Sequence, residues 1–189
     1  MKKNLTALTI LLSTVVLFGC SNTDSKKSTS SSQHISKNKK KLTSQDKIKT
    51  QKFNFENKQV DNSEFTIKIT KYRVIKPGKK GNKNGKSPVI AFWYQVKNKN
   101  KNNHVDPITA WQAVFKAQQL GSNNKKYDLQ IAALPDDKYL QSQMTEIKQG
   151  KTVENAIAYK LNNKKNSVDL ISIKGPFGEG SGKETFPIK

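Results

Sequence analysis

The feature that most constrains the fold is a series of short apolar runs, about ten residues apart, along residues 51–189. The run 65–75 places Phe65, Ile67 and Ile69 at every second position, which is the period of a half-buried strand. Segments rich in Gly, Asn and Pro, such as 76–88, separate the runs and are typical of turns. Many short strands with little helix predict an all-β fold, as an antiparallel sandwich or barrel.

The segment 106–121 fits two secondary structures. Asp106 and Pro107 are typical of a helix start, because aspartate caps helices and proline is tolerated in the first turn. The alternate apolar residues from Trp111 to Ala117 fit a strand equally well. From the pattern alone, both interpretations stay open.

The first 19 residues have the layout of an export signal. Lys2 and Lys3 precede an apolar stretch of about 14 residues, which at about 1.5 Å per residue is too short for a bilayer core of about 30 Å. "LFGC" ends at Cys20, the only cysteine, and resembles the lipobox of bacterial lipoproteins. The alternative, a buried free cysteine, lacks apolar neighbours downstream. We therefore predict a lipoprotein signal peptide at 1–19 and a diacylglyceryl anchor on Cys20, which holds the chain on the extracellular face of the cytoplasmic membrane.

Residues 20–50 have the composition of a disordered basic linker. The segment is rich in serine, lysine and asparagine, contains no aromatic residue, and carries eight lysines against Asp24 and Asp46. Its lysines have two interpretations, which are attraction to anionic lipid headgroups and simple solubility. We predict that the folded domain begins at residue 51.

The order of several segments resembles a known group of proteins. "YQVKNKN", "AWQAVFKAQQL", "EIKQGKTVENAIAYKL" and "SVDLISIKG" are similar to segments of Gram-positive lipoproteins of the lactic-acid-bacteria type, whose function is unknown and whose domain is immunoglobulin-like (telokin-like). The resemblance implies that 51–189 is an immunoglobulin-like antiparallel β-sandwich. It also implies that "AVFKAQQL" is a strand. It supplies no catalytic residues.

The charge is strongly positive, with 35 basic residues against 14 acidic ones and a net charge of +21. Only Arg73 is an arginine, which argues against sequence-specific nucleic-acid binding, because arginine is the usual reader of guanine and phosphate. The lysines gather in predicted loops, including 125–126 and 164–165, and a basic pole of the sandwich is one interpretation; a merely lysine-rich composition is the other. The candidate polyanion-binding residues are Lys79, Lys80, Lys83, Lys86, Lys97, Lys99 and Lys101.

Signatures of catalysis and of metal binding are weak. "GNKNGKS" (81–87) has three residues between its glycines where a phosphate loop needs four, and "GEGSGK" (178–183) lacks the final Ser or Thr, so both are predicted to be turns. His104 and Asp106 have no further histidine or cysteine nearby to complete a transition-metal site. The adjacent Asp136 and Asp137 are typical of a solvated loop. We predict no enzyme activity, no metal and no cofactor.

The run 89–96 is apolar on both faces, which predicts a central strand. Within it, Phe92, Trp93 and Tyr94 place at least one ring on each face. Most aromatic rings are expected in the core, but an outward Trp93 or Tyr94 beside lysines is a candidate for stacking on a sugar or a base.

These features favour a non-enzymatic cell-surface lipoprotein that acts as a binding or accessory module. Its expected partners are the membrane, through the lipid on Cys20, and teichoic acid or another anionic envelope polymer, or a protein. One alternative is an extracellular binder of nucleic acid or other polyanions. A second is an enzyme that modifies the cell wall.

Overall fold

The computed structural model describes residues 51–102 and 104–189. The predicted signal peptide at 1–19, the lipid on Cys20 and the linker at 20–50 lie outside the described residues. His34 lies outside them as well. The following description therefore concerns residues 51–102 and 104–189.

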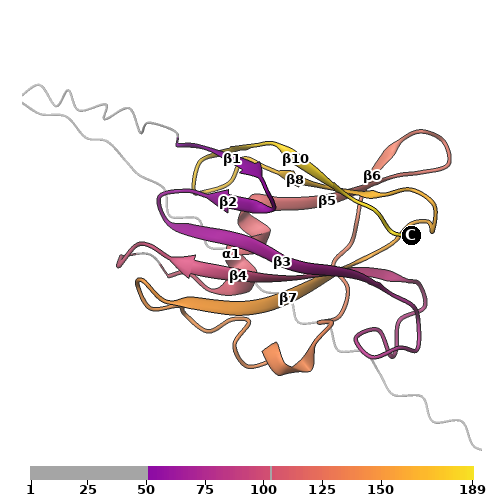
Figure 1. The fold of residues 1–189 in the computed structure, drawn as a ribbon, viewed down its shortest axis with the longest axis horizontal. Helices are drawn as coiled ribbons and strands as arrows, with labels where there is room; N and C mark the ends of the chain where they lie inside the picture. The colour runs from indigo at the N-terminus through magenta and orange to yellow at the C-terminus, as the bar shows by residue number, and fades with distance from the viewer. Residues whose placement is uncertain (1–50, 103) are drawn as a thin grey trace, which may run out of the picture. The chain divides into compact units, whose positions relative to one another are not determined.

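The strands of this domain form two sheets that pack face to face (Figure 1). The six-stranded sheet has the order β7-β4-β3-β2-β1-β9, and the four-stranded sheet has the order β10-β8-β5-β6. The strands are β1 (Lys52–Glu56), β2 (Gln59–Asp61), β3 (Phe65–Ile75), β4 (Val89–Asn98), β5 (Phe115–Leu120), β6 (Lys126–Asp128), β7 (Thr152–Lys160), β8 (Val168–Ser172), β9 (Glu179–Ser181) and β10 (Lys183–Phe186).

The prediction of an all-β sandwich is confirmed. One pairing differs from the expected antiparallel pattern, because β1 runs parallel to β9, with Phe53 opposite Gly180. This pair joins residues that are far apart in the sequence, so no local turn signal reveals it. The predicted turn at 178–183 is therefore wrong for Glu179–Ser181, which form β9. The immunoglobulin-like assignment stays a prediction.

The central pair of the large sheet follows the sequence pattern closely. Phe65, Ile67 and Ile69 on β3 are all buried, as their alternation predicts. β4 is buried on both faces, since Val89 and Ala91 are as inaccessible as Phe92. The second face is covered by the chain that follows β6.

That covering segment does not form a regular strand. β6 ends at Asp128, and the chain then makes only an isolated bridge from Ile131 to Tyr159. The Ala132 amide donates to the Ala158 carbonyl at 2.8 Å, which places the segment beside β7 and over Val89, Ala91 and Ala158. Ala132 in this run packs against a second, smaller apolar cluster, whereas Leu129 belongs to the main core and Ile131 is exposed.

The strand prediction for "AVFKAQQL" (113–120) is wrong at its first two residues, which belong to a helix. Pro107–Val114 form helix α1, and the chain changes to strand β5 at Phe115. Asp106 caps the helix, because its Oδ1 accepts the Thr109 amide at 2.8 Å. Both sequence patterns were therefore present, one after the other.

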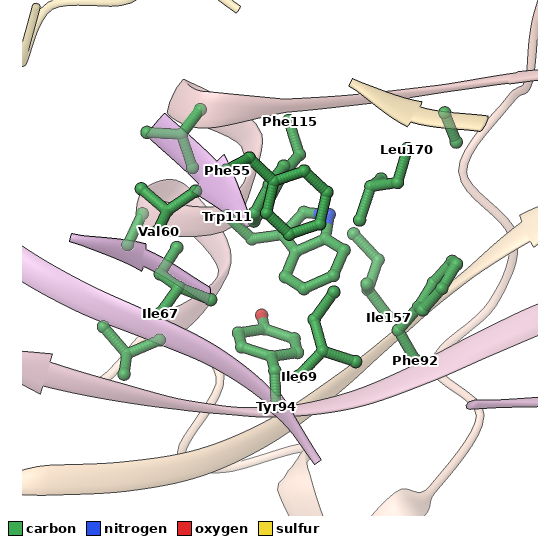
Figure 2. Close-up of a cluster of buried hydrophobic side chains, with 14 of the residues drawn as sticks. Phe55, Val60, Ile67, Ile69, Phe92, Tyr94, Trp111, Phe115, Ile157 and Leu170 are labelled. Carbon is green, nitrogen blue, oxygen red and sulfur yellow. The ribbon is translucent and has the colours of Figure 1, made fainter. Parts of the chain in front are cut away.

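Trp111 on α1 occupies the centre of the core between the sheets (Figure 2). Its indole ring packs 4.4 Å from the ring of Tyr94 and 4.7 Å from the ring of Phe115, measured between centroids. The indole Nε1 donates to the Tyr159 hydroxyl at 2.7 Å, so this buried donor is satisfied. Burial raises the pKa of Tyr159 to about 12, although the hydrogen bond from Trp111 lowers it in part.

Candidate functional site

Four chain segments meet at one end of the sandwich, at the right in Figure 1. The amide of Leu161 donates to the Pro88 carbonyl at 2.9 Å, and the Asn163 side chain donates to the Leu120 carbonyl at 2.8 Å. These contacts join the loops that follow β3, β5 and β7, and the C-terminal Ile188 shares a pocket with Lys76 and Lys164. We call the segments 76–88, 121–126, 161–167 and 187–189 the basic end.

The basic end carries ten lysines and no acidic residue. Its lysines are Lys76, Lys79, Lys80, Lys83, Lys86, Lys125, Lys126, Lys164, Lys165 and Lys189. Of these ten, Lys126 is the one that forms an ion pair within the described residues, with Asp169 on β8 at 3.2 Å. A surface of this kind attracts polyanions through a summed positive field.

The longest loop of the basic end has a defined shape. The Asn82 side chain is buried and donates to the carbonyls of Ile75 and Ser87, at 3.1 and 2.9 Å, which ties the two ends of the loop together. Gly81 has a φ of +88°, which glycine adopts without strain. The prediction that 81–87 is a turn and not a phosphate loop is confirmed.

Three of the candidate lysines are not part of the basic end. Lys97, Lys99 and Lys101 lie where β4 ends, whereas the loop with Lys79 to Lys86 precedes the start of β4. The ten residues of β4 separate the two groups by about 30 Å, at about 3.3 Å per residue. The candidate residues therefore divide into two groups at opposite ends of the sandwich.

The second group also lies among acidic side chains. Lys99 Nζ contacts Asp61 Oδ1 at 2.8 Å and donates to the Asn62 carbonyl at 2.6 Å. Burial alone raises the pKa of the Asp61 carboxyl, but hydrogen bonds from Lys99 and Thr66 outweigh this effect and lower the pKa below its usual value. Lys99 in this group therefore holds neighbouring segments together as well as adding positive charge to the surface.

A pocket of about 470 Å³ opens on the outer face of the large sheet. We call it the Trp93 pocket. Its lining residues are Thr70, Lys71, Arg73, Lys80, Trp93, Pro135, Asp136, Lys138, Tyr139 and Glu154. Trp93 is half-buried and faces outward, as one of the two aromatic candidates was expected to do. Tyr94 does not, because it is buried and its hydroxyl donates to the Pro107 carbonyl at 3.0 Å.

Both carboxylates of the Trp93 pocket are held by hydrogen bonds. Asp136 Oδ2 accepts the Trp93 indole N–H at 3.3 Å, and Asp136 also caps the short 3₁₀ helix η1 (Asp137–Tyr139). Glu154 accepts from the Tyr139 hydroxyl at 3.3 Å and from Gln95 at 3.3 Å. Asp136 and Asp137 do not face one site, because Asp137 lines a neighbouring pocket with residues 81–87.

The remaining polar candidates have structural partners. His104 Nδ1 lies 2.9 Å from Glu146 Oε2, and Asp106, which was considered with His104, caps α1 instead. Within the part of the chain that the structure describes, no three His, Cys, Asp or Glu side chains gather in a way that suits a metal ion. No described helix is both long and apolar enough to cross a lipid bilayer.

Sequence reasoning named Trp93, Lys80 and Asp136 for separate reasons, but it did not bring them together and it missed the other residues of the pocket. Arg73 and Lys71 come from β3, whereas Asp136, Lys138 and Tyr139 come from the segment that crosses the outer face. The signal at Arg73 was its uniqueness among 35 basic residues. The crossing segment gave no signal, because its path depends on tertiary packing.

Comparison with known proteins supports the fold and leaves the function open. No curated protein matches the sequence. A solved structure, described as a "putative lipoprotein" from Staphylococcus aureus subsp. aureus NCTC 8325, is similar in fold, with a TM-score of 0.60 and 19% sequence identity. The similarity covers 71% of this chain and 91% of that one. A family model matches residues 35–172, and the chain therefore belongs to the family described as a domain of unknown function, DUF5067.

Proposed function

We propose that this protein is a non-enzymatic, lipid-anchored surface protein whose sandwich binds an anionic polymer of the cell envelope through the basic end. The observation that carries the proposal is the collection of ten lysines, without an acidic residue, on segments that the fold brings together. Lysines on loops contact phosphates as flexible point charges and do not read a base sequence. Teichoic acid is the expected polymer, because it presents many phosphates along one chain.

Two observations support anchoring at the extracellular face of the cytoplasmic membrane. The sequence ends its apolar N-terminal stretch at Cys20, and the structurally similar Staphylococcus aureus protein is described as a "putative lipoprotein". The described domain starts at β1, and Phe53 there belongs to the row of Phe65 and Asn98, at the end of the sandwich away from the basic end. The basic end therefore points away from the point where the linker enters.

Two alternatives are less well supported. Extracellular nucleic acid shares the phosphate chemistry of teichoic acid, but the basic end contains no arginine for base recognition. An enzyme that modifies the wall needs carboxylates poised at substrate, whereas Asp136 caps η1 and binds Trp93. A protein partner remains compatible with the same basic surface.

Binding of the full chain, in detergent micelles, to purified teichoic acid tests the proposal. We expect affinity to fall steeply with salt, as for other multivalent lysine–phosphate contacts. Replacing Lys79, Lys80, Lys83 and Lys86 by Gln is expected to weaken binding and to flatten the salt dependence. The matched control replaces Lys52, Lys97, Lys101 and Lys148 by Gln, which removes the same charge elsewhere.

An equal loss of teichoic acid affinity in the two variants contradicts a localised site, because binding would then depend only on the net charge of the protein. Equal affinity for duplex DNA and teichoic acid indicates a general polyanion binder instead. Cleavage of purified peptidoglycan that is lost in Asp136→Asn or Asp137→Asn contradicts the non-enzymatic part of the proposal.

A further inference from the structure

The only arginine in the chain, Arg73, lies in the Trp93 pocket. Its Cζ lies 5.5 Å from the centroid of the Trp93 ring, and Lys71 Nζ lies 5.4 Å from the same ring. The pairing of Lys71 with Trp93 across β3 and β4 accounts for this proximity. Cation–π attraction therefore holds two cations over one indole ring, and both side chains remain exposed.

The charges of the Trp93 pocket do not cancel. Four cations, Lys71, Arg73, Lys80 and Lys138, line it together with two carboxylates. Within the described residues, none of these four cations lies within 4.0 Å of a carboxylate oxygen. Both carboxylates instead accept hydrogen bonds from neutral donors, Asp136 from Trp93 and Glu154 from Tyr139. The two carboxylates thus offset only two of the four positive charges, and no ion pair joins them to the cations of the pocket.

We propose that the Trp93 pocket binds a phosphate-bearing sugar or polyol, with Arg73 and Lys71 on the phosphate. The planar guanidinium offers two parallel N–H groups to phosphate oxygens, a geometry that lysine lacks. The surplus of two positive charges suits a phosphate better than a singly charged carboxylate. The volume of about 470 Å³ lies within the range of small-molecule sites, about 300–1,000 Å³.

Further groups of the pocket suit hydroxyls of the ligand. The free lone pairs of Asp136 and Glu154 accept hydrogen bonds from alcohols, and Thr70 Oγ1, which donates to the Trp93 carbonyl at 3.1 Å, keeps an acceptor lone pair. A cluster of cations beside hydroxyl acceptors favours a phosphorylated polyhydroxy compound over inorganic phosphate alone.

The Trp93 pocket adjoins the basic end. Lys80 belongs to the loop 76–88 and also lines the pocket, and the next residue, Gly81, lines the neighbouring pocket of about 420 Å³. The inference rests on the proposed function in one respect, since the pocket would select one unit of the polymer that the basic end attracts. Binding of a monomeric ligand tests the pocket independently of polymer binding.

The two tryptophans provide a direct test. The full chain in detergent micelles, labelled with fluorotryptophan, has one fluorine resonance from Trp93 in the pocket and one from Trp111 in the core, assigned with Trp93→Phe. Titration with glucose-1-phosphate or glycerol-3-phosphate is expected to shift the Trp93 resonance and to leave Trp111 in place. Arg73→Gln is expected to weaken this binding about tenfold or more, and Arg73→Lys to restore it in part. Lys52→Gln, with the same loss of charge on β1, is expected to bind like the wild type.

Several outcomes overturn the inference. They are a Trp93 resonance that stays in place at millimolar ligand, an Arg73→Gln variant that binds like Lys52→Gln, and equal shifts with glucose or glucuronate. The two phosphate probes distinguish a sugar ligand from a polyol ligand. A variant that replaces Lys79, Lys83 and Lys86 by Gln keeps Lys80, which lines the Trp93 pocket. Loss of teichoic acid binding in that variant, with the monomer titration unchanged, shows that the two sites act separately. A pocket that fails while polymer binding persists leaves the proposed function standing.

Discussion

At the scale of single residues, the hydrogen bond between Trp111 and Tyr159 joins the helix to the large sheet inside the core. Both side chains are buried, and the 2.7 Å contact satisfies the indole N–H of Trp111. Tyr159→Phe removes the acceptor and leaves that N–H without a partner. We expect a loss of about 1–3 kcal/mol in the free energy of unfolding.

Urea denaturation measures this loss, and Tyr127→Phe serves as the control. Tyr127 is exposed, although its hydroxyl accepts from Asn123 at 2.8 Å, so we expect a change within about 0.5 kcal/mol. Equal stability of the two variants contradicts the importance of the buried contact.

Two glycines of the loop 76–88 allow steric contact to be separated from backbone strain. Gly78 and Gly81 both have positive φ, at +75° and +88°. A Cβ on Gly78 meets nothing within 4 Å, whereas one on Gly81 lies 2.5 Å from the Pro135 carbonyl oxygen. We expect Gly78→Ala to cost about 1 kcal/mol and Gly81→Ala clearly more, by thermal denaturation. Equal costs contradict the close approach of the loop to Pro135.

At the scale of elements, the cap of α1 fixes where the helix begins. The Asp106 carboxylate accepts the Thr109 amide, and Pro107 follows in the first turn. Asp106→Ala is expected to lower the free energy of unfolding by about 0.5–2 kcal/mol, while Asp106→Asn retains the acceptor and most of the stability. Urea denaturation of the two variants checks the prediction, which is wrong if Asn and Ala are equally destabilising.

Asp169 on β8 connects three strands of the small sheet. Its carboxylate contacts Lys126 on β6, Lys183 on β10 and Thr185 on β10. Burial alone raises the pKa of Asp169, but the hydrogen bonds from Thr185, Lys126 and Lys183 outweigh this effect and hold the pKa below its usual value.

Because the folded state lowers this pKa, the contribution of Asp169 to stability is present above the unfolded value of about 3.9 and is lost as the pH falls through the lower folded value. Asp169→Asn is therefore expected to destabilise the domain at neutral pH, and the difference from the wild type is expected to shrink below about pH 4. Urea denaturation of both proteins, at neutral pH and below about pH 4, measures this difference in stability. A difference that does not depend on pH contradicts the role of the charge.

For single residues and for elements, the sequence predicts those features that depend on neighbouring residues in the chain, and not those that depend on tertiary contacts. The alternation in β3 predicts its buried face because strand geometry alone imposes a period of two. The run 106–121 does not show where helix changes to strand, since Trp111 and Phe115 satisfy both periods. The strand implied by family resemblance is correct only from Phe115 onward.

Which side chains of β4 face outward is likewise not visible in the sequence alone. Phe92, Trp93 and Tyr94 alternate between the faces, but the sequence does not say which ring faces outward until the partners of the strand are known. The Trp93 pocket depends further on the crossing segment 131–139, whose position follows from packing on β7. The sequence shows which polar residues the segment contains, but it does not show that they lie beside Trp93.

At the scale of the whole molecule, the family match ends at residue 172, but the fold does not. β9 and β10 follow, and β10 carries Phe186, which is buried against Phe92 at 4.9 Å between ring centroids. Phe186→Ala is expected to cost about 3–5 kcal/mol. A chain that ends after Lys174 is expected not to fold, as measured by far-ultraviolet circular dichroism and protease resistance. A stable, cooperative domain without these strands contradicts this prediction.

The opposite placement of the chain entry and the basic end has a mechanical consequence. For a chain held at residue 51 and gripped by a ligand at the basic end, tension runs along the strands. The ladder hydrogen bonds of β1 with β2 and β9 are then loaded in shear, so that they resist together and do not open one at a time.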